Sequence, residues 1–362
     1  MENNKEKMLN LLTEEFKKLN EKTFRVYFMV PDSKGKPNGY LNYIYETAYE
    51  LKEMGYNVHM LHQEEEFVGV AEWMGEKYME LPHHNIEKDK IDVAYSDFLF
   101  IPEFYSNVMN SVKKMPCKRV VIAQKFDYIT QVIPAGISWF NYDIKDCVTL
   151  SRTLKNDIEK CFPYVNTRVV SPMVDSSMYN IPETPKKLIV NIISKNEEDV
   201  NNIVKPFFWK YPMYKWVSFR ELKNVTKTTF MEALKESAIT VWADEKTEFG
   251  SSAIEAIKCG NILIGKLPEK ELEWMVNEDG TSYKDNAIWY TNVQDVHDII
   301  AGVIEGFLKD NLPSVLSNEM IKMGEKYTKE EFVKSINEVY VNDIFEQRKN
   351  DTLKKMEGLK NE

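Results

Sequence analysis

The chain has 362 residues, of which 43% are hydrophobic and 29% charged, and its formal net charge is −10. This length suits two domains of ordinary size, and the composition is typical of a soluble globular protein rather than a disordered or fibrous one. The negative balance opposes non-specific binding to nucleic acid.

No segment is typical of a targeting signal or a membrane span. Residues 1–21 are charged and amphipathic, without the uninterrupted apolar core of a signal peptide, and no apolar run is long enough to cross a bilayer. The cysteines are scattered and show no C-x-x-C spacing; they are Cys117, Cys147, Cys161 and Cys259. We therefore expect reduced thiols in a cytoplasmic protein without stable membrane insertion.

Strand and helix patterns alternate along the first half of the chain. Apolar residues at helical spacing predict a first helix, and a strand then leads into a flexible loop that contains Gly39. The predicted helices are 1–20, 40–54 and 151–161, and the predicted strands are 24–30, 56–61, 78–81, 98–102, 119–123, 147–150 and 168–171. Strands that alternate with helices predict a doubly wound parallel sheet.

Two segments between these elements are predicted to be loops. Residues 133–143 show no clear period, and their aromatic side chains are expected to pack on the body of the domain. His83 and His84 are expected to be exposed loop residues, because adjacent side chains at a strand end point apart. A metal site at these histidines is the alternative.

The βα pattern restarts after a polar segment with two prolines at 180–187, which predicts a linker. The second set of predicted strands is 188–193, 215–219, 239–242, 262–264 and 288–290, with helices at 197–204, 229–237, 251–258 and 293–308. We therefore predict a first domain over 1–180, completed by a C-terminal helix at 329–362, and a second domain over 181–328. The charged end, 349–362, is expected to be frayed or solvated.

The most informative stretch runs from Thr247 to Gly265. An apolar strand enters a short acidic loop, a helix follows with Glu255 one turn in, and a second apolar strand comes directly after Gly260. The free N–H groups and the positive dipole end of such a helix suit a phosphate, and a carboxylate one turn in can accept hydrogen bonds from sugar hydroxyls. A plain βαβ unit with serine caps is the alternative.

The pattern E-x-F-G-x-x-x-x-E-A-x-x-x-G resembles the nucleotide-sugar signature of retaining glycosyltransferases with the GT-B fold. The matching positions are Phe249, Gly250, Glu255, Ala256 and Gly260. The family usually places its first Glu eight residues before the second. Here Thr247 occupies that position, and Glu248 stands seven residues before Glu255.

Other segments follow the family in the same order along the chain. Residues 170–179 resemble its interdomain motif, residues 267–280 resemble the segment after the signature, and the loop with Gly39 matches its glycine-bearing first loop. The resemblance implies an α/β protein of two doubly wound Rossmann-like domains facing a cleft. It also implies a C-terminal helix, beginning at 329, that crosses back to the first domain.

The resemblance implies a binding site for a nucleotide-diphospho-sugar donor. Its donor-binding positions here are Gly39, Glu248, Phe249, Gly250, Ser251, Ser252, Glu255 and Arg220. Glu255 corresponds to the residue that holds the donor ribose, and Arg220 lies near the loop where the nucleobase sits in this fold. For Arg220 an exposed surface charge is the alternative.

The candidate catalytic residues are Lys195 and Asp127. The family usually has an Arg and a Lys after the first strand of its second domain, and Lys195 alone stands there; an exposed loop charge is the alternative. Many relatives carry a His after the strand that here ends at Ala123, whereas this chain has Asp127 nearby, which could also be a loop cap. Because the chain lacks a D-x-D motif, we expect no metal and no cofactor besides the donor itself.

These observations lead to one function and two alternatives. The first is a retaining, metal-independent glycosyltransferase that moves a sugar, with UDP or GDP as the nucleotide, to a hydroxyl of a glycan, lipid or other acceptor. The second is a GT-B protein without turnover that binds a nucleotide or a partner. A modified base in phage DNA is the alternative acceptor, and the acidic balance argues against it.

Overall fold

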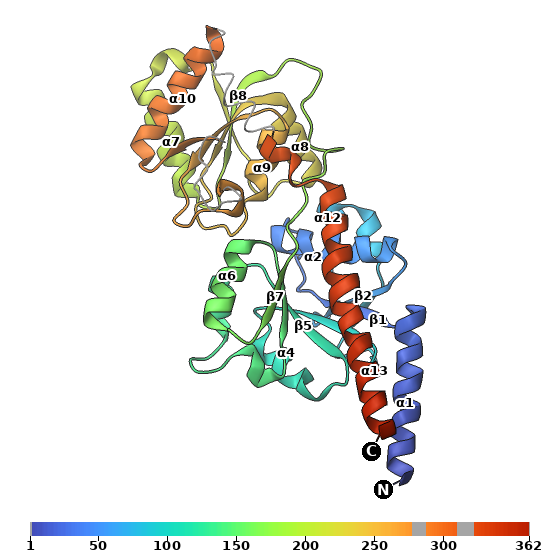
Figure 1. Cartoon of the computed structure of the whole chain (residues 1–362). Coiled ribbons are helices and arrows are strands. Elements are labelled where there is room, and N and C mark those ends of the chain that lie inside the picture. Colours follow the sequence, from blue (N-terminus) through green and yellow to red (C-terminus); the bar gives the residue numbers. More distant parts are fainter. Residues whose placement is uncertain (1, 277–286, 310–321, 362) are drawn as a thin grey trace. The chain divides into compact units, whose positions relative to one another are not determined.

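The computed structural model describes residues 2–276, 287–309 and 322–361, and the chain forms two compact units (Figure 1). Unit 1 comprises Met1–Ser171 together with Val333–Glu362, and unit 2 comprises Pro172–Phe332. Residues 277–280, which end the segment resembling the family after the signature, lie outside the described residues.

Unit 1 contains a seven-stranded sheet in the order β3-β2-β1-β4-β5-β6-β7, and every pairing in it is parallel. Its strands are β1 Arg25–Met29, β2 Asn57–His62, β3 His83–Asn85, β4 Phe98–Pro102, β5 Lys118–Ala123, β6 Asp146–Thr149 and β7 Asn166–Val169. The central strand β4 is buried along its whole length, as expected for a parallel strand covered on both faces. The direction in which strands are added reverses between β1 and β4, which makes this the topological switch point.

Three helices of unit 1 lie within one residue of their predicted bounds: α1 Glu2–Glu21, α2 Gly39–Glu53 and α6 Arg152–Cys161. Asn38 caps α2 by accepting a hydrogen bond from the Tyr40 N–H at 2.9 Å, and Ser151 caps α6 by accepting one from Leu154 at 3.1 Å. The helices are α1 Glu2–Glu21, α2 Gly39–Glu53, α3 Ala71–Met74, α4 Ser106–Ser111, α5 Phe126–Val132 and α6 Arg152–Cys161, with short 3-10 turns at Glu76–Glu80, Val112–Lys114 and Trp139–Tyr142.

The end of the chain returns to unit 1. A π-helical segment, Asn337–Phe345, continues into α13, Glu346–Asn361, which lies beside α1 (Figure 1). The Phe345 ring packs 4.5 Å from the Phe98 ring, measured between centroids. The predicted C-terminal helix on the first domain is therefore confirmed. Residues 349–361 are helical rather than frayed, with Thr352 and Met356 buried, but most of their side chains are exposed, as the solvated alternative expects.

Two arginines hold this C-terminal segment to the rest of unit 1. Arg168 on β7 is buried and forms ion pairs with Asp146 on β6, at 2.7 Å, and with Asp343. Arg348 donates to the backbone oxygen of Tyr95 at 2.6 Å, and its guanidinium lies 3.5 Å from the centroid of that ring. Buried guanidinium groups with several acceptors are costly to remove, so these contacts fix the helix in place.

Unit 2 contains a five-stranded parallel sheet in the order β12-β11-β10-β8-β9. Its strands are β8 Lys187–Ile193, β9 Ser218–Glu221, β10 Ser237–Trp242, β11 Ile262–Lys266 and β12 Ile288–Tyr290. Its helices are α7 Glu197–Lys210, α8 Lys227–Glu236, α9 Ser251–Lys258 and α10 Val293–Leu308, with 3-10 turns at Pro212–Tyr214 and Glu273–Met275. The boundary between the units at 332 falls within α12, Lys329–Ile336. Across the described ranges, no helix has both the length and the hydropathy to cross a membrane.

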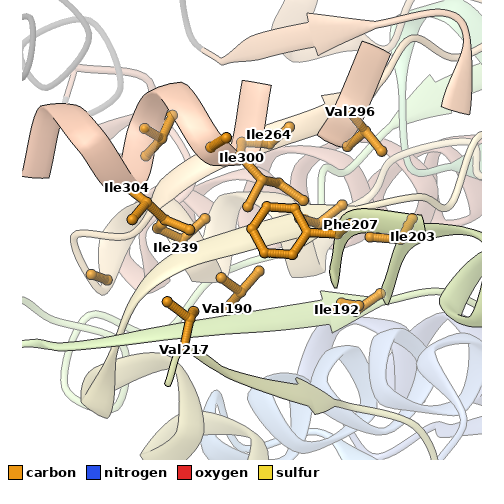
Figure 2. Packing of buried hydrophobic residues seen from close by; sticks show 14 of the residues in the cluster. Val190, Ile192, Ile203, Phe207, Val217, Ile239, Ile264, Val296, Ile300 and Ile304 are labelled. Atoms are coloured by element: carbon orange, nitrogen blue, oxygen red, sulfur yellow. The ribbon is translucent and has the colours of Figure 1, made fainter. Parts of the chain in front are cut away.

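The core of unit 2 lies between its sheet and the helices α7 and α10 (Figure 2). Phe207 of α7 is fully buried among branched aliphatic side chains of β8, β10 and α10, including Val190, Ile239 and Ile300. Burial of this apolar surface is the main contribution to the stability of the unit.

Three predicted elements of the chain differ from the structure. The strand expected at 78–81 is a 3-10 turn, Glu76–Glu80, and the strand is β3 instead. The strand expected at 215–219 lies at Ser218–Glu221, and α7 continues past 204 to Lys210, through Pro206. For the two strands, tertiary packing overrides weak local signals, because apolar runs this short do not fix a strand boundary.

Replacing Phe207 with Ala should lower the free energy of unfolding of unit 2 by about 3–5 kcal/mol, because it leaves a large cavity. Urea unfolding followed by circular dichroism measures this. Trp209→Ala is the matched control, since Trp209 lies on the same helix and is 77% exposed; it should change stability by about 0.5 kcal/mol or less. Equal effects of the two substitutions would contradict the packing in Figure 2.

Candidate functional site

The predicted strand, turn and helix of the signature are present in unit 2. β10 is buried throughout, a loop follows it, and Gly250 precedes α9 with a φ of +73°. A Cβ at Gly250 would lie 2.9 Å from the Trp242 ring and 3.2 Å from Leu272. Both the backbone conformation and the lack of space therefore require glycine at this position.

Two indole N–H groups hold the signature loop in this shape. Trp242, the last residue of β10, donates to the Ser252 hydroxyl at 3.2 Å, and Trp274 donates to the backbone oxygen of Phe249 at 2.6 Å. The Phe249 side chain is itself buried and packs edge-on against Tyr327, with 5.1 Å between ring centroids. These contacts with aromatic side chains therefore fix the conformation of the loop.

The turn into α9 presents backbone donors at the carboxyl-terminal edge of the sheet. α9 spans eight residues, and its first N–H groups have no acceptor within the helix. These groups and the helix dipole favour an anion beside Ser251 and Ser252, both of which are half-buried. Glu255 lies one turn further along the same helix and is also half-buried.

Charged side chains gather at the same edge. Lys195 follows β8 and lies 2.8 Å from the Asp244 carboxylate, which follows β10. Lys266 at the end of β11 pairs with Glu245 at 2.9 Å. Because β8, β10 and β11 are neighbours, their carboxyl ends bring these residues together next to the signature loop.

The two remaining charged positions of the predicted donor site differ in their surroundings. Glu248 has a largely buried side chain, 15% exposed, with the Lys270 ammonium 3.8 Å away. The sequence predicts that Arg220 follows the strand at 215–219, but the structure places Arg220 within β9. It pairs at 2.7 Å with Glu236, which comes directly before β10. Hydrogen bonds from Lys187 and Arg220 lower the pKa of Glu236 to about 2. Arg220 is therefore held toward the amino end of β10, away from Lys195.

The two candidate residues in unit 1 lie at helix starts. Gly39 is the first residue of α2, and a Cβ there would meet no atom within 4 Å. Asp127 is the second residue of α5, with a side chain that is 64% exposed and 3.5 Å from the Lys125 ammonium. Both residues are therefore accessible at the carboxyl-terminal edge of the seven-stranded sheet.

Glu103 is a residue that the sequence reasoning missed. It follows β4 directly, is 0% exposed, and accepts backbone hydrogen bonds from Gln124 at 3.0 Å and Lys125 at 2.9 Å. The Tyr40 hydroxyl donates to its other carboxylate oxygen. Burial raises the pKa of Glu103 to about 7, although these hydrogen bonds act in the opposite direction. A single Glu after a strand carries no periodic or motif signal, so only the packing reveals it.

Comparison with known proteins adds information on the fold. No protein-family model matches the chain, and no curated protein matches it in sequence. Solved structures do match: sucrose-phosphate synthase from Thermosynechococcus elongatus has a TM-score of 0.59 and 8% identity, covering 88% of this chain and 98% of that one. The N-terminal domain of trehalose-6-phosphate phosphatase from Candida albicans has a TM-score of 0.54 and 9% identity, covering 86% and 95%.

The chain has the GT-B fold. At these identities the likeness concerns the fold alone. The predicted fold class is confirmed, since each unit is a Rossmann-like layer of parallel strands with helices.

The histidines of this GT-B protein correct one further prediction. His83 and His84 are not exposed loop residues; they form β3, which pairs with β2, and both are half-buried. His83 Nε2 lies 2.9 Å from the Tyr45 hydroxyl, and His84 Nε2 lies 2.9 Å from His59 Nδ1. Burial lowers the pKa of His59 and of His83 to about 4. Among the residues that the structure describes, no group of three or more His, Cys, Asp or Glu side chains could hold a metal ion.

Replacing Gly250 with Ala should lower the free energy of unfolding by about 2 kcal/mol or more, through the left-handed backbone and the contact with Trp242. Gly302→Ala in α10 is the matched control: a Cβ there meets no atom within 4 Å, so it should raise stability by about 0.5–1 kcal/mol. Thermal unfolding of both variants measures the difference. The same sign for both would contradict the tight turn.

Stability should depend on pH through Glu103. Its folded-state pKa of about 7 lies above the ordinary value of 4.5. Between these values the folded state binds more protons than the unfolded state, so stability falls as pH rises. Relative to Glu103→Gln, the free energy of unfolding of wild type should therefore fall by about 3 kcal/mol from pH 4.5 to 8. Exposed Glu53→Gln should follow wild type; parallel curves for all three proteins would refute the assignment.

Proposed function

We propose that this chain is a glycosyltransferase that transfers a sugar from a nucleotide-diphospho-sugar to an acceptor hydroxyl, by a retaining and metal-independent route. The observation that carries the proposal is the signature loop of unit 2, in which Gly250, the start of α9 and Lys195 lie at one edge of a parallel sheet. Two of the matching structures are named for enzymes of sugar phosphates, sucrose-phosphate and trehalose-6-phosphate.

The donor diphosphate would lie at the start of α9. Departure of the nucleoside diphosphate develops negative charge, and preorganised N–H donors at a helix start stabilise it. The Lys195 ammonium would supply a positive charge after exchanging its partner Asp244 for a phosphate oxygen. Lys266, which is half-buried beside Glu245, would add to the positive potential at this edge.

The carboxylates would bind the sugar portions of the donor. Glu255, half-buried one turn into α9, would accept hydrogen bonds from the ribose hydroxyls, and Glu248 would lie closer to the transferred sugar. Exposed Asp127 in unit 1 would act on the acceptor side. Because the sequence has no D-x-D motif, Lys195 and the helix dipole take the part that a bridging metal plays in other transferases.

A GT-B protein without turnover, which binds a nucleotide or a partner, is the second candidate. Two observations favour it: Thr247 stands where the family has its first Glu, and Gln124 to Asp127 replace the segment that carries the family's His. Hydrolysis of a donor without acceptor separates the two, since a binding protein shows none.

The first experiment is a thermal-shift screen of the full chain against UDP, GDP, ADP, dTDP and CMP and their sugars. A ligand that binds only the folded state raises the melting temperature when its concentration exceeds the dissociation constant. A clear shift with one nucleotide supports the donor site and names the donor. No shift with any of them, in a folded sample, would count against the donor site and favour the protein without turnover that binds a partner.

Replacing Glu255 with Gln should weaken binding of the nucleotide identified in this screen by about 10- to 100-fold, because charge-assisted hydrogen bonds to its hydroxyls are lost. Isothermal titration calorimetry measures the effect. Glu232→Gln is the control, since Glu232 is exposed on α8 of the same unit. Unchanged affinity in a folded Glu255→Gln variant would remove the assignment of Glu255 to the donor.

A further inference from the structure

Unit 1 has a polar residue buried at its topological switch point. β1 and β4 are adjacent in the sheet, but the chain leaves them in different directions, toward α2 and toward Glu103. Crevices of this kind, outside the carboxyl ends of parallel strands, are where open α/β sheets bind ligands. Glu103 lies there with no exposed surface.

The Glu103 carboxylate joins three separate elements at this edge. It accepts from the Tyr40 hydroxyl on α2 and from the backbone N–H groups of Gln124 and Lys125, which connect β5 to α5. The Gln124 side chain closes the arrangement by donating to the Tyr40 backbone oxygen at 2.9 Å. Without the carboxylate, these donors would be left without their acceptor in a water-poor site.

Half-buried aromatic rings surround this buried carboxylate. The Tyr40 ring lies 5.2 Å from Phe104 and 6.3 Å from Tyr128, and Phe104 lies 4.8 Å from Tyr105. Tyr40 is held by Glu103 directly, and Tyr128 lies on α5, whose start is held through the Lys125 N–H. We call the surface formed by Tyr40, Phe104, Tyr105 and Tyr128 the aromatic rim.

We propose that Glu103 is a positioning residue that fixes the aromatic rim in the form that receives the apolar face of a sugar-ring acceptor. The inference rests on the proposed function, which requires an acceptor hydroxyl. Aromatic faces pack well against the flat faces of rings, while the Tyr128 hydroxyl and the Lys125 ammonium, 5.4 Å from the Tyr128 ring, offer polar contacts beside them. A flexible acyl chain would leave these polar groups without hydrogen bonds.

The charge of Glu103 sets the strength of this anchoring. Because burial raises the pKa of Glu103 to about 7, the buried arrangement favours the neutral carboxyl group, and ionisation above that pH weakens the anchoring relative to a form that is open to water. The titratable groups around it are phenols, a thiol, and one ion pair, which belong to Tyr40, Tyr105, Tyr128, Cys147 and the Lys125–Asp127 pair. Burial raises the pKa of Tyr40, Tyr105 and Cys147 further from neutral pH, whereas it raises the pKa of Glu103 to about 7.

The test compares the full chain with its Glu103→Gln, Glu103→Asp and Tyr40→Phe variants at pH 6 and pH 8. The first readout is hydrogen exchange at the Gln124 and Lys125 amides, corrected for the intrinsic rate. In wild type, protection should be about 10-fold lower at pH 8 than at pH 6, because ionised Glu103 favours the open form. Glu103→Gln should show weak protection at both pH values.

The second readout is binding of a panel of methyl glycosides, measured by ligand-observed NMR. Wild type should bind at least one glycoside several-fold more tightly at pH 6 than at pH 8. Glu103→Gln should bind it about 10-fold more weakly than wild type at pH 6 and lose the pH dependence, and Glu103→Asp should recover part of both. Tyr40→Phe should weaken binding without removing the pH dependence, because the Gln124 and Lys125 contacts remain.

Two results would overturn the inference. One is a folded Glu103→Gln variant that binds glycosides as wild type does at both pH values. The other is a wild-type protein that binds no methyl glycoside. Nucleotide binding, measured in the same samples, should be equal in wild type and all variants, because the signature loop, Lys195 and Glu255 lie in unit 2 and Gly39 is unchanged. A nucleotide shift without glycoside binding therefore rejects this inference and leaves the donor site standing.

Discussion

Parallel strand pairing is the constraint on which both units depend. All pairings among the described residues are parallel, so every strand ends at the same edge of its sheet as its neighbours. Each connection must then cross over the face of the sheet, which is why helices follow the strands and why the strands are apolar. The polar residues that remain are collected at the strand ends, where loops and helix starts meet.

The sequence predicts the parts of this arrangement that have a local signal. The sequence predicts the long amphipathic helices and the buried apolar strands because their periods are strong. It predicts the turn at Gly250 because a glycine, two serines and a helix follow one another there. The same reasoning placed Glu248, Ser251, Ser252 and Glu255 on one loop and helix. The roles of these residues in binding or catalysis remain predictions.

The residues that the sequence did not reveal depend on contacts between distant segments. Glu103 belongs to no sequence pattern. It stands out only through the hydrogen bonds that it accepts from the Tyr40 hydroxyl and from the turn after β5. His83 and His84 belong to a strand of three residues, which is too short to give a strand signal, and only pairing with β2 defines β3. Arg220 was misplaced for the same reason, since the exact ends of short strands are set by their partners.

The C-terminal segment has a consequence for how the protein is made. Unit 1 is discontinuous: the chain leaves it at Ser171 and re-enters at Val333. A ribosome therefore synthesises all of unit 2 before it supplies the helix that pairs with α1 and the carboxylate that pairs with Arg168. During translation the apolar surface around Phe98 stays uncovered until Phe345 emerges. Unit 1 is therefore begun first and completed last, and there is a stage of translation at which all of unit 2 has been synthesised while unit 1 still lacks its C-terminal segment.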